Sequence, residues 1–121
     1  MDKKRILIVE DNLIASLALE MMIEGAGFES AGRMVNADNL VEQLGEYRPD
    51  LILLDIMLDG EKTGIEVAKE LREQFDTPII FTTALNDLDT RKAIDEIDNA
   101  SLTSKPYLEE GIIKAINQLI R

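Results

Sequence analysis

The chain has 121 residues, which is the size of one domain and leaves no room for two. It contains neither cysteine nor histidine, so disulfides, histidine acid–base chemistry, a histidine phosphocarrier role and the usual zinc ligands are excluded. Thirteen basic against twenty-four acidic residues give a net charge of −11, which disfavours nucleic acid as a partner and favours cations.

The first residues do not form a targeting signal. Met1 to Arg5 is basic, but only the apolar residues 6–9 precede Glu10, too few for the apolar core of a signal peptide. No stretch approaches the roughly 18 apolar residues of a membrane span. We therefore expect a soluble, cytoplasmic protein that does not associate with membranes.

Short apolar runs predict five β-strands, and a helical pattern follows each of them. The runs 6–9 and 51–54 are continuously apolar, as expected for strands that are buried on both faces. The second strand is weaker, Pro78 opens the fourth, and the last is short. In chain order the predicted strands are 6–9, 28–34, 51–54, 79–82 and 100–104.

Capping residues, glycines and prolines mark the ends of five predicted helices. The first helix is apolar on nearly every side, whereas the fourth is charged and has little apolar face. The helices run from the Asn12 cap to Gly25 or Gly27, from Asn36 or Asp38 to Tyr47, from the Thr63 cap to Leu71, from Asp87 to Ile97, and from Leu108 to Ile120.

Five strand–helix repeats predict an α/β fold with a doubly wound, five-stranded parallel sheet. Crossovers between parallel strands are right-handed, so the helices cover both faces of the sheet. The usual order for five strands is 2-1-3-4-5. That order is taken from known folds of this kind and is not deduced from the spacing. It makes the first and third strands neighbours.

Polar residues follow four of the apolar runs: Glu10-Asp11, Asp55, Thr83 and Lys105. The carboxyl ends of parallel strands open into one crevice, where ligands bind. These side chains should therefore converge, although almost a hundred positions separate the first from the last. Taken alone, Glu10-Asp11 reads as a helix cap, and Thr83 as a hydroxyl bonded to backbone. Their combination favours a shared site.

Three converging carboxylates repel one another unless a cation compensates them. Mg²⁺ prefers hard oxygen ligands and takes one or two protein carboxylates together with a substrate phosphate. Asp11 and Asp55 fit as direct ligands, Glu10 as a ligand through water, and the backbone carbonyl of Met57 as a further ligand. The spacing of a calcium-binding EF-hand loop is absent from the sequence.

The same residues suit phosphoryl transfer. An aspartate such as Asp55 can attack a phosphoryl group and form an aspartyl phosphate. The reaction needs positioning and charge neutralisation, which Mg²⁺, the Lys105 ammonium and the Thr83 hydroxyl or nearby backbone N–H groups would supply. At Lys105-Pro106, a cis bond that aims the lysine into the crevice and a trans proline that opens the last helix both remain open.

The chain resembles the receiver domains of two-component response regulators over essentially its whole length. The matching segments are 6–11 (ILIVED), 50–55 (DLILLD), Thr83-Ala84 and Lys105-Pro106-Tyr107. The resemblance implies a flavodoxin-like (βα)5 receiver fold in which Asp55 accepts a phosphoryl group from a sensor histidine kinase or a phosphotransfer protein. It also implies that Glu10, Asp11 and Asp55 bind Mg²⁺, that Thr83 relays the switch, that Lys105 contacts the phosphoryl group, and that the bond before Pro106 is cis.

Two departures from the family concern a loop and the switch. Asp59 stands where the family commonly has proline, and Gly64 follows Asp55 by nine residues instead of eight, so the loop at 58–63 should be one residue longer. Leu102 replaces the usual switch aromatic, which puts its coupling to Thr83 in question. In this respect the chain is similar to a subgroup of single-domain receivers that lack the aromatic.

A third departure concerns hydrolysis of the aspartyl phosphate. Met57 and Leu85 occupy positions that orient a hydrolytic water in the family, and neither has a polar side chain. We therefore expect the aspartyl phosphate to hydrolyse slowly.

The sequence stops at Arg121, directly after the last predicted helix, so we expect one receiver domain over 1–121 and no output domain. As a whole protein it would act by binding a partner protein or as a sink for phosphoryl groups. As a fragment, its output would lie elsewhere. The apolar first helix either docks a kinase helix pair with an exposed face or is wholly core, and the second interpretation is favoured.

Two other classes of function compete with a signalling switch, which would not be an enzyme. A phosphatase or phosphotransferase with Asp55 as nucleophile would resemble the haloacid dehalogenase group. That group places an acidic residue two positions after the nucleophile, where this chain has Met57. An interaction module that works without phosphorylation would not need the complete acceptor set.

Overall fold

The computed structural model describes residues 3–57, 62–84, 88–105 and 108–120. Its five strands form one parallel sheet in the order β2-β1-β3-β4-β5, as the sequence predicts. In chain order the elements are β1 (Arg5–Val9), α1 (Leu13–Gly25), β2 (Glu29–Met34), α2 (Leu40–Tyr47), β3 (Leu51–Asp55), α3 (Gly64–Arg72), β4 (Ile79–Thr83), α4 (Leu88–Asp95), β5 (Ala100–Ser104) and α5 (Glu109–Leu119).

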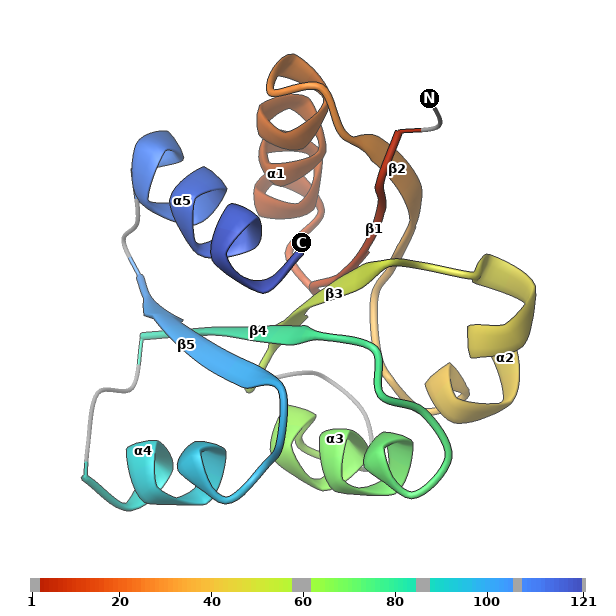
Figure 1. Ribbon diagram of the computed structural model, residues 1–121, viewed down its shortest axis with the longest axis vertical. Helices are drawn as coiled ribbons and strands as arrows, with labels where there is room; N and C mark the ends of the chain where they lie inside the picture. The colour runs from red at the N-terminus through yellow and green to blue at the C-terminus, as the bar shows by residue number, and fades with distance from the viewer. Residues whose placement is uncertain (1–2, 58–61, 85–87, 106–107, 121) are drawn as a thin grey trace.

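Helices cover both faces of the sheet, with α1 and α5 on one side and α2, α3 and α4 on the other (Figure 1). Alternate residues of the central strands feed the two cores. Ile6 and Ile8 pack with α1 and α5, whereas Leu7 and Val9 pack with the other helices. All of β3 and β4 is buried, which explains why both strands are continuously apolar up to their final polar residues.

The caps expected for the first and third helices are confirmed. The Asn12 side chain accepts a hydrogen bond from the backbone of Ala15. Thr63 and Glu66 form a reciprocal capping box at the start of α3. The second helix begins later than expected, at Leu40, because the Asn36 side chain accepts from the backbone of Asp38 and holds a turn there.

The expectation that the first helix is wholly core is wrong. Leu13, Ile14, Leu17 and Met21 are between 47% and 83% exposed, while Ser16, Leu19 and Ile23 face the sheet. A helix that is apolar on every side does not itself specify which side packs. Here one side of α1 packs on the sheet, and the opposite side is exposed to water. We call Leu13, Ile14, Leu17 and Met21 the outer face of α1.

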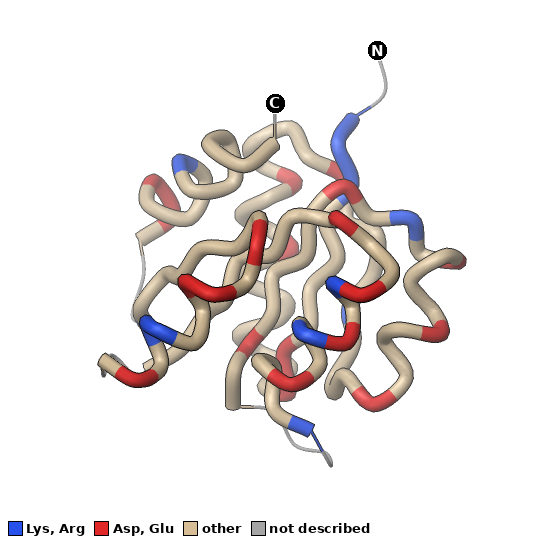
Figure 2. Tube along the Cα trace, turned by 60° about the horizontal axis from the view of Figure 1, so that its bottom comes forward, with Lys and Arg blue, Asp and Glu red and all other residues tan. Residues whose placement is uncertain are grey.

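Acidic residues are spread over the whole trace and outnumber basic ones, in keeping with the net charge of −11 (Figure 2). None of the helices in the described part of the chain has the length and apolar character needed to cross a membrane. The expectations for residues 58–61, Leu85, the bond before Pro106 and Tyr107 lie outside the described residues.

Candidate functional site

The register of the sheet brings the ends of four strands, β1, β3, β4 and β5, to one edge. Val9 pairs with Leu54, and Asp55 pairs with Thr82 on the next strand. Thr83 pairs in turn with Ser104. Glu10, Asp55 and Lys105 therefore leave the sheet at the same edge, each at the end of its own strand.

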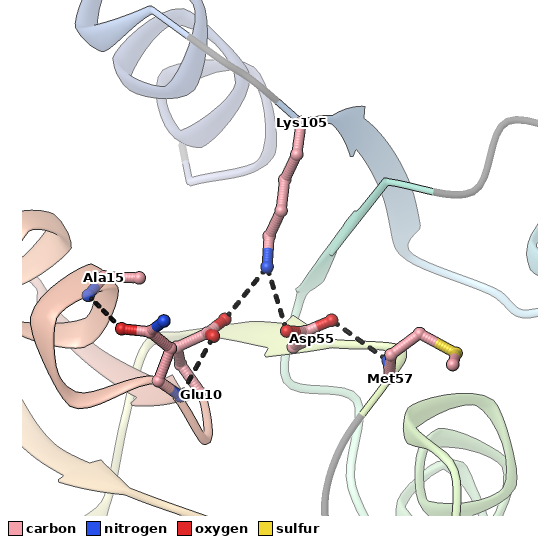
Figure 3. A network of polar contacts seen from close by, with 6 residues as sticks. Glu10, Ala15, Asp55, Met57 and Lys105 are labelled. Atoms are coloured by element: carbon pink, nitrogen blue, oxygen red, sulfur yellow. Dashed lines mark hydrogen bonds and ion pairs between the residues drawn. The ribbon is translucent and has the colours of Figure 1, made fainter.

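Lys105 bridges two carboxylates at this edge (Figure 3). Its Nζ lies 2.9 Å from Oδ2 of Asp55 and 3.2 Å from Oε2 of Glu10. Both carboxylates are almost fully buried, with 5% and 3% of their side-chain surface exposed, whereas the lysine side chain is 28% exposed. The ammonium thus supplies charge compensation that water cannot supply to either carboxylate.

Backbone N–H groups hold the other oxygen of each carboxylate. The Met57 N–H donates to Oδ1 of Asp55 at 3.0 Å, and the Asn12 N–H donates to Oε1 of Glu10 at 3.2 Å. Each carboxylate is therefore held by one backbone donor and by the shared ammonium. The two acids are fixed in position before any ligand arrives.

Asp11 completes an acidic cluster, which we define as Glu10, Asp11 and Asp55. One carboxylate oxygen from each of the three lies within 4.8 Å of the others. The single positive charge of Lys105 does not neutralise three negative charges, and the oxygen donors are of the hard type that Mg²⁺ prefers. The cluster therefore fits a divalent cation, as the sequence predicts. The role of the Met57 carbonyl stays a prediction.

The pKa of Glu10 is raised to about 7. Burial is the largest cause, followed by a hydrogen bond and charge repulsion from Asp55, and Lys105 opposes the shift. For Lys105, burial acts to lower the pKa, but its bonds and attraction to Asp55 and Glu10 outweigh burial and raise it. The lysine therefore stays charged at neutral pH.

Thr83 ends β4 and is fully buried. Its backbone carbonyl accepts a hydrogen bond of 2.7 Å from the N–H of Lys105, which ties the end of β4 to the residue that carries the ammonium. The structure thus places the backbone of Thr83 next to the backbone of Lys105. The part of its hydroxyl in binding a phosphoryl group, or in relaying a switch, stays a prediction.

In the sequence Gly64 stands out only through the length of the loop before it, but the structure gives it a place in the site. A Cβ atom at Gly64 would collide with the carbonyl oxygen of Asp55 and lie 3.0 Å from the Cα of Ile56. The Gly64 N–H donates to the Ile56 carbonyl at 3.1 Å. The first residue of α3 therefore packs directly on the backbone of Asp55, and any side chain there would displace one or the other.

This arrangement matches a known family. Residues 6–117 match the family model described as the response regulator receiver domain. The chain belongs to this receiver family. The resemblance carried by the motifs of the sequence is thereby confirmed. Receiver domains take phosphoryl groups from kinases, and phosphorylation and Mg²⁺ are typical of the family.

Two curated relatives show how this receiver compares with longer proteins. The probable C4-dicarboxylate response regulator DctR of Halalkalibacterium halodurans is 32% identical over 94% of this chain and 50% of its own length. The DNA-binding response regulator MtrA of Mycobacterium tuberculosis is 36% identical over 70% of this chain and 36% of its own length. The chain thus spans half or less of these relatives.

Solved structures give the same fold. The signal receiver domain of a modulated diguanylate cyclase from Desulfovibrio desulfuricans superposes with a TM-score of 0.88 at 31% identity, and covers 98% of this chain and 94% of that one. The chemotaxis protein CheY4 of Vibrio cholerae has a TM-score of 0.87 at 20% identity, over 98% of this chain and 99% of that one. At that identity the second likeness concerns the fold alone.

The raised pKa of Glu10 predicts a pH-dependent stability in the metal-free receiver. The folded state binds its proton more tightly than the unfolded state, so this contribution to the free energy of unfolding falls as pH rises from about 4.5 to about 7. In Glu10→Gln the side chain is uncharged at every pH. The difference in free energy of unfolding between variant and wild type should therefore grow with pH by about 1–3 kcal/mol. Urea unfolding followed by circular dichroism at pH 5, 6, 7 and 8 measures this, and parallel curves for the two proteins would contradict it.

The packing of Gly64 on Asp55 predicts that Gly64→Ala impairs phosphorylation. The displaced Asp55 backbone should lower the rate of phosphorylation by acetyl phosphate about tenfold or more, since small misplacements of reacting groups cost large factors. The rate is measured by intact-protein mass spectrometry at a temperature where circular dichroism shows the variant to be folded.

Gly111→Ala is the matched control for this experiment. A Cβ at Gly111, within α5, meets nothing within 4 Å, so the control should keep the wild-type rate and gain up to about 1 kcal/mol of stability. A folded Gly64→Ala protein that is phosphorylated at the wild-type rate would show that the close contact does not position Asp55.

Proposed function

We propose that this receiver is a phosphorylation-dependent signalling switch in which Asp55 accepts a phosphoryl group from a sensor histidine kinase or a phosphotransfer protein, with Mg²⁺ as cofactor. The observation that carries the proposal is the contact of Lys105 with both Asp55 and Glu10 at the crevice edge. The buried Asp55 carboxylate provides the nucleophile, and the Lys105 ammonium provides positive charge for the phosphoryl oxygens. Together with Glu10 and Asp11, Asp55 also provides a site for a metal cation.

In the proposed reaction an oxygen of Asp55 forms a bond to phosphorus while the bond from phosphorus to the donor nitrogen breaks. The electron pair of that bond leaves with the imidazole of the donor histidine. Lys105 lies 2.9 Å from Oδ2 of Asp55, within reach of charge that develops on phosphoryl oxygens there. The Met57 N–H keeps the carboxylate oriented throughout. A bound Mg²⁺, held by Asp11, Asp55 and Glu10, would neutralise further negative charge.

The outer face of α1 supports the partner part of the proposal. It presents four large apolar side chains to water, and α1 has no basic residue in its last turn and no acidic residue in its first. A helix pair of a kinase would cover these side chains while its histidine reaches Asp55. Such an encounter belongs in the cytoplasm. The phosphorylated protein would then bind a downstream protein or release its phosphoryl group as a sink.

The proposal treats the protein as a switch and not as an enzyme with a metabolite substrate. Met57, which stands two positions after Asp55, has a thioether side chain that is mostly exposed and has no proton to give a leaving group. This disfavours a phosphatase of the haloacid dehalogenase kind. An interaction module independent of phosphorylation would leave the buried Asp55–Lys105 pair without a purpose.

The proposal predicts that incubation with acetyl phosphate or an active histidine kinase, in the presence of Mg²⁺, adds one phosphoryl group to the wild-type protein. Asp55→Asn should show no gain in mass, because an amide does not replace the carboxylate as nucleophile. Intact-protein mass spectrometry measures the gain, and removal of the donor then lets the decay be followed. Decay of the phosphorylated form over many minutes would fit the apolar side chain of Met57, which cannot orient a hydrolytic water.

Three outcomes would count against the proposal. An equal gain in mass in Asp55→Asn would place the modification elsewhere. Continuous turnover of a simple phosphate ester would favour the phosphatase. Failure of every donor to modify the folded wild-type protein, with partner binding unaffected by Asp55→Asn, would favour the constitutive module.

A further inference from the structure

An apolar groove runs beside the phosphoacceptor site. It has a volume of about 510 Å³ and is lined by Glu10, Asn12, Ala15, Ala18, Met22, Ala84 and Lys105. Most of its lining is apolar. Glu10 and Lys105 contact each other, and Lys105 contacts Asp55, so the groove meets the acceptor carboxylate at its charged end.

One flank of α1 forms the wall of this groove. Ala15, Ala18 and Met22 are spaced three and four residues apart, which places them on one side of the helix. That side is distinct from the core side with Leu19 and Ile23, and from the outer face. The opposite flank carries Glu20, which accepts a hydrogen bond from the Ser30 hydroxyl of β2. The groove therefore has a wall of its own, separate from the surface assigned above to a kinase.

Small side chains keep the groove open. Ala18 and Ala84 are exposed and Ala15 is half-buried, so larger residues at any of these positions would fill it. A ligand with its phosphoryl group at Asp55 and Lys105 can extend the rest of its body through this groove, past Ala84 and along α1. A ligand that matches the site and the groove together has an anionic phosphoryl end and a short apolar body.

We propose that the groove receives the acyl group of small acyl phosphates and makes this receiver prefer donors with longer apolar acyl chains over acetyl phosphate. This inference rests on the proposed function, because it assigns a class of small-molecule donor to the same Asp55. The groove acts on the part of the donor that leaves, so it sets selectivity among donors and not the ability of Asp55 to react.

The chemistry is a simple exchange of one acyl phosphate for another. An oxygen of the Asp55 carboxylate forms a bond to the phosphorus of the donor, and the bond from phosphorus to the acyl oxygen breaks. The electron pair stays on that oxygen, so the donor departs as a carboxylate anion. No oxidant, reductant or additional reactant enters. The apolar chain of this carboxylate lies in the groove until it diffuses away.

The test compares acetyl phosphate with butyryl phosphate, whose leaving carboxylates are nearly equal in basicity. Initial rates of phosphorylation at equal, subsaturating donor concentrations are measured by intact-protein mass spectrometry in the presence of Mg²⁺. Butyryl phosphate should react roughly five- to fifteen-fold faster, as expected for two methylene groups that are partly buried. In Ala18→Leu, which fills the groove, the ratio of the two rates should fall to about one.

Ala26→Leu is the matched control. It makes the same change on an exposed residue at the C-terminal cap of the same helix, outside the groove lining, so the wild-type ratio should persist. A second readout does not depend on reaction. Butylphosphonate should shift the methyl NMR signals of Ala15 and Met22 in the wild type and not in Ala18→Leu.

The outcomes separate the two proposals. Equal rates for both donors in the wild type, or a preference that Ala18→Leu leaves intact, would overturn the groove assignment while the Asp55-dependent gain in mass upholds the switch. No gain in mass with either acyl phosphate would overturn the groove assignment, and an Asp55-dependent gain in mass with an active histidine kinase would still uphold the switch.

Discussion

One ammonium group shared between two buried carboxylates is the interaction on which the site depends. Lys105 comes from the end of β5, and its partners come from the ends of β1 and β3, so the pair of contacts joins three strands of the sheet. Such a cluster contributes little to stability, because burying the charges costs about as much as their attraction returns. Burial and the neighbouring Asp55 carboxylate raise the pKa of Glu10. The excess of acidic groups fits the cation and the phosphoryl group of the proposed function.

The fold supplies the constraints that keep these charged groups in place. Continuous apolar strands bury both faces of the sheet and fix their register against α1 and α5 on one side and α2, α3 and α4 on the other. Because of this register, Asp55 ends β3 beside Thr82. Lys105 comes directly after Ser104, which pairs with Thr83, and so lies at the same edge. Gly64 lets α3 start against the backbone of Asp55, and the Met57 N–H holds its carboxylate. The backbone therefore positions the residues of the site, and their side chains supply the charges.

The sequence predicts those features that are local or periodic. Asn12 and Thr63 are recognisable caps, and polar residues after apolar strands mark the site because parallel strands end at one edge. Features that depend on contacts between distant elements do not follow from local or periodic patterns. The closeness of Gly64 to Asp55 depends on how α3 returns to the sheet, and the exposure of Leu17 and Met21 depends on which side of α1 the sheet takes. The groove beside Ala84 has the same origin, since its walls come from separate elements.

The claim that the acidic cluster is a cation site is tested most directly by thermal unfolding against Mg²⁺ concentration, with ionic strength held constant by NaCl. A cation that binds the folded state alone raises the midpoint of unfolding. The midpoint for the wild type should rise by about 2–8 °C as the site fills, whereas that of Asp11→Asn, which lacks one acidic ligand, should rise far less. Equal rises in the two proteins, or a wild-type midpoint that Mg²⁺ does not change, would contradict the account.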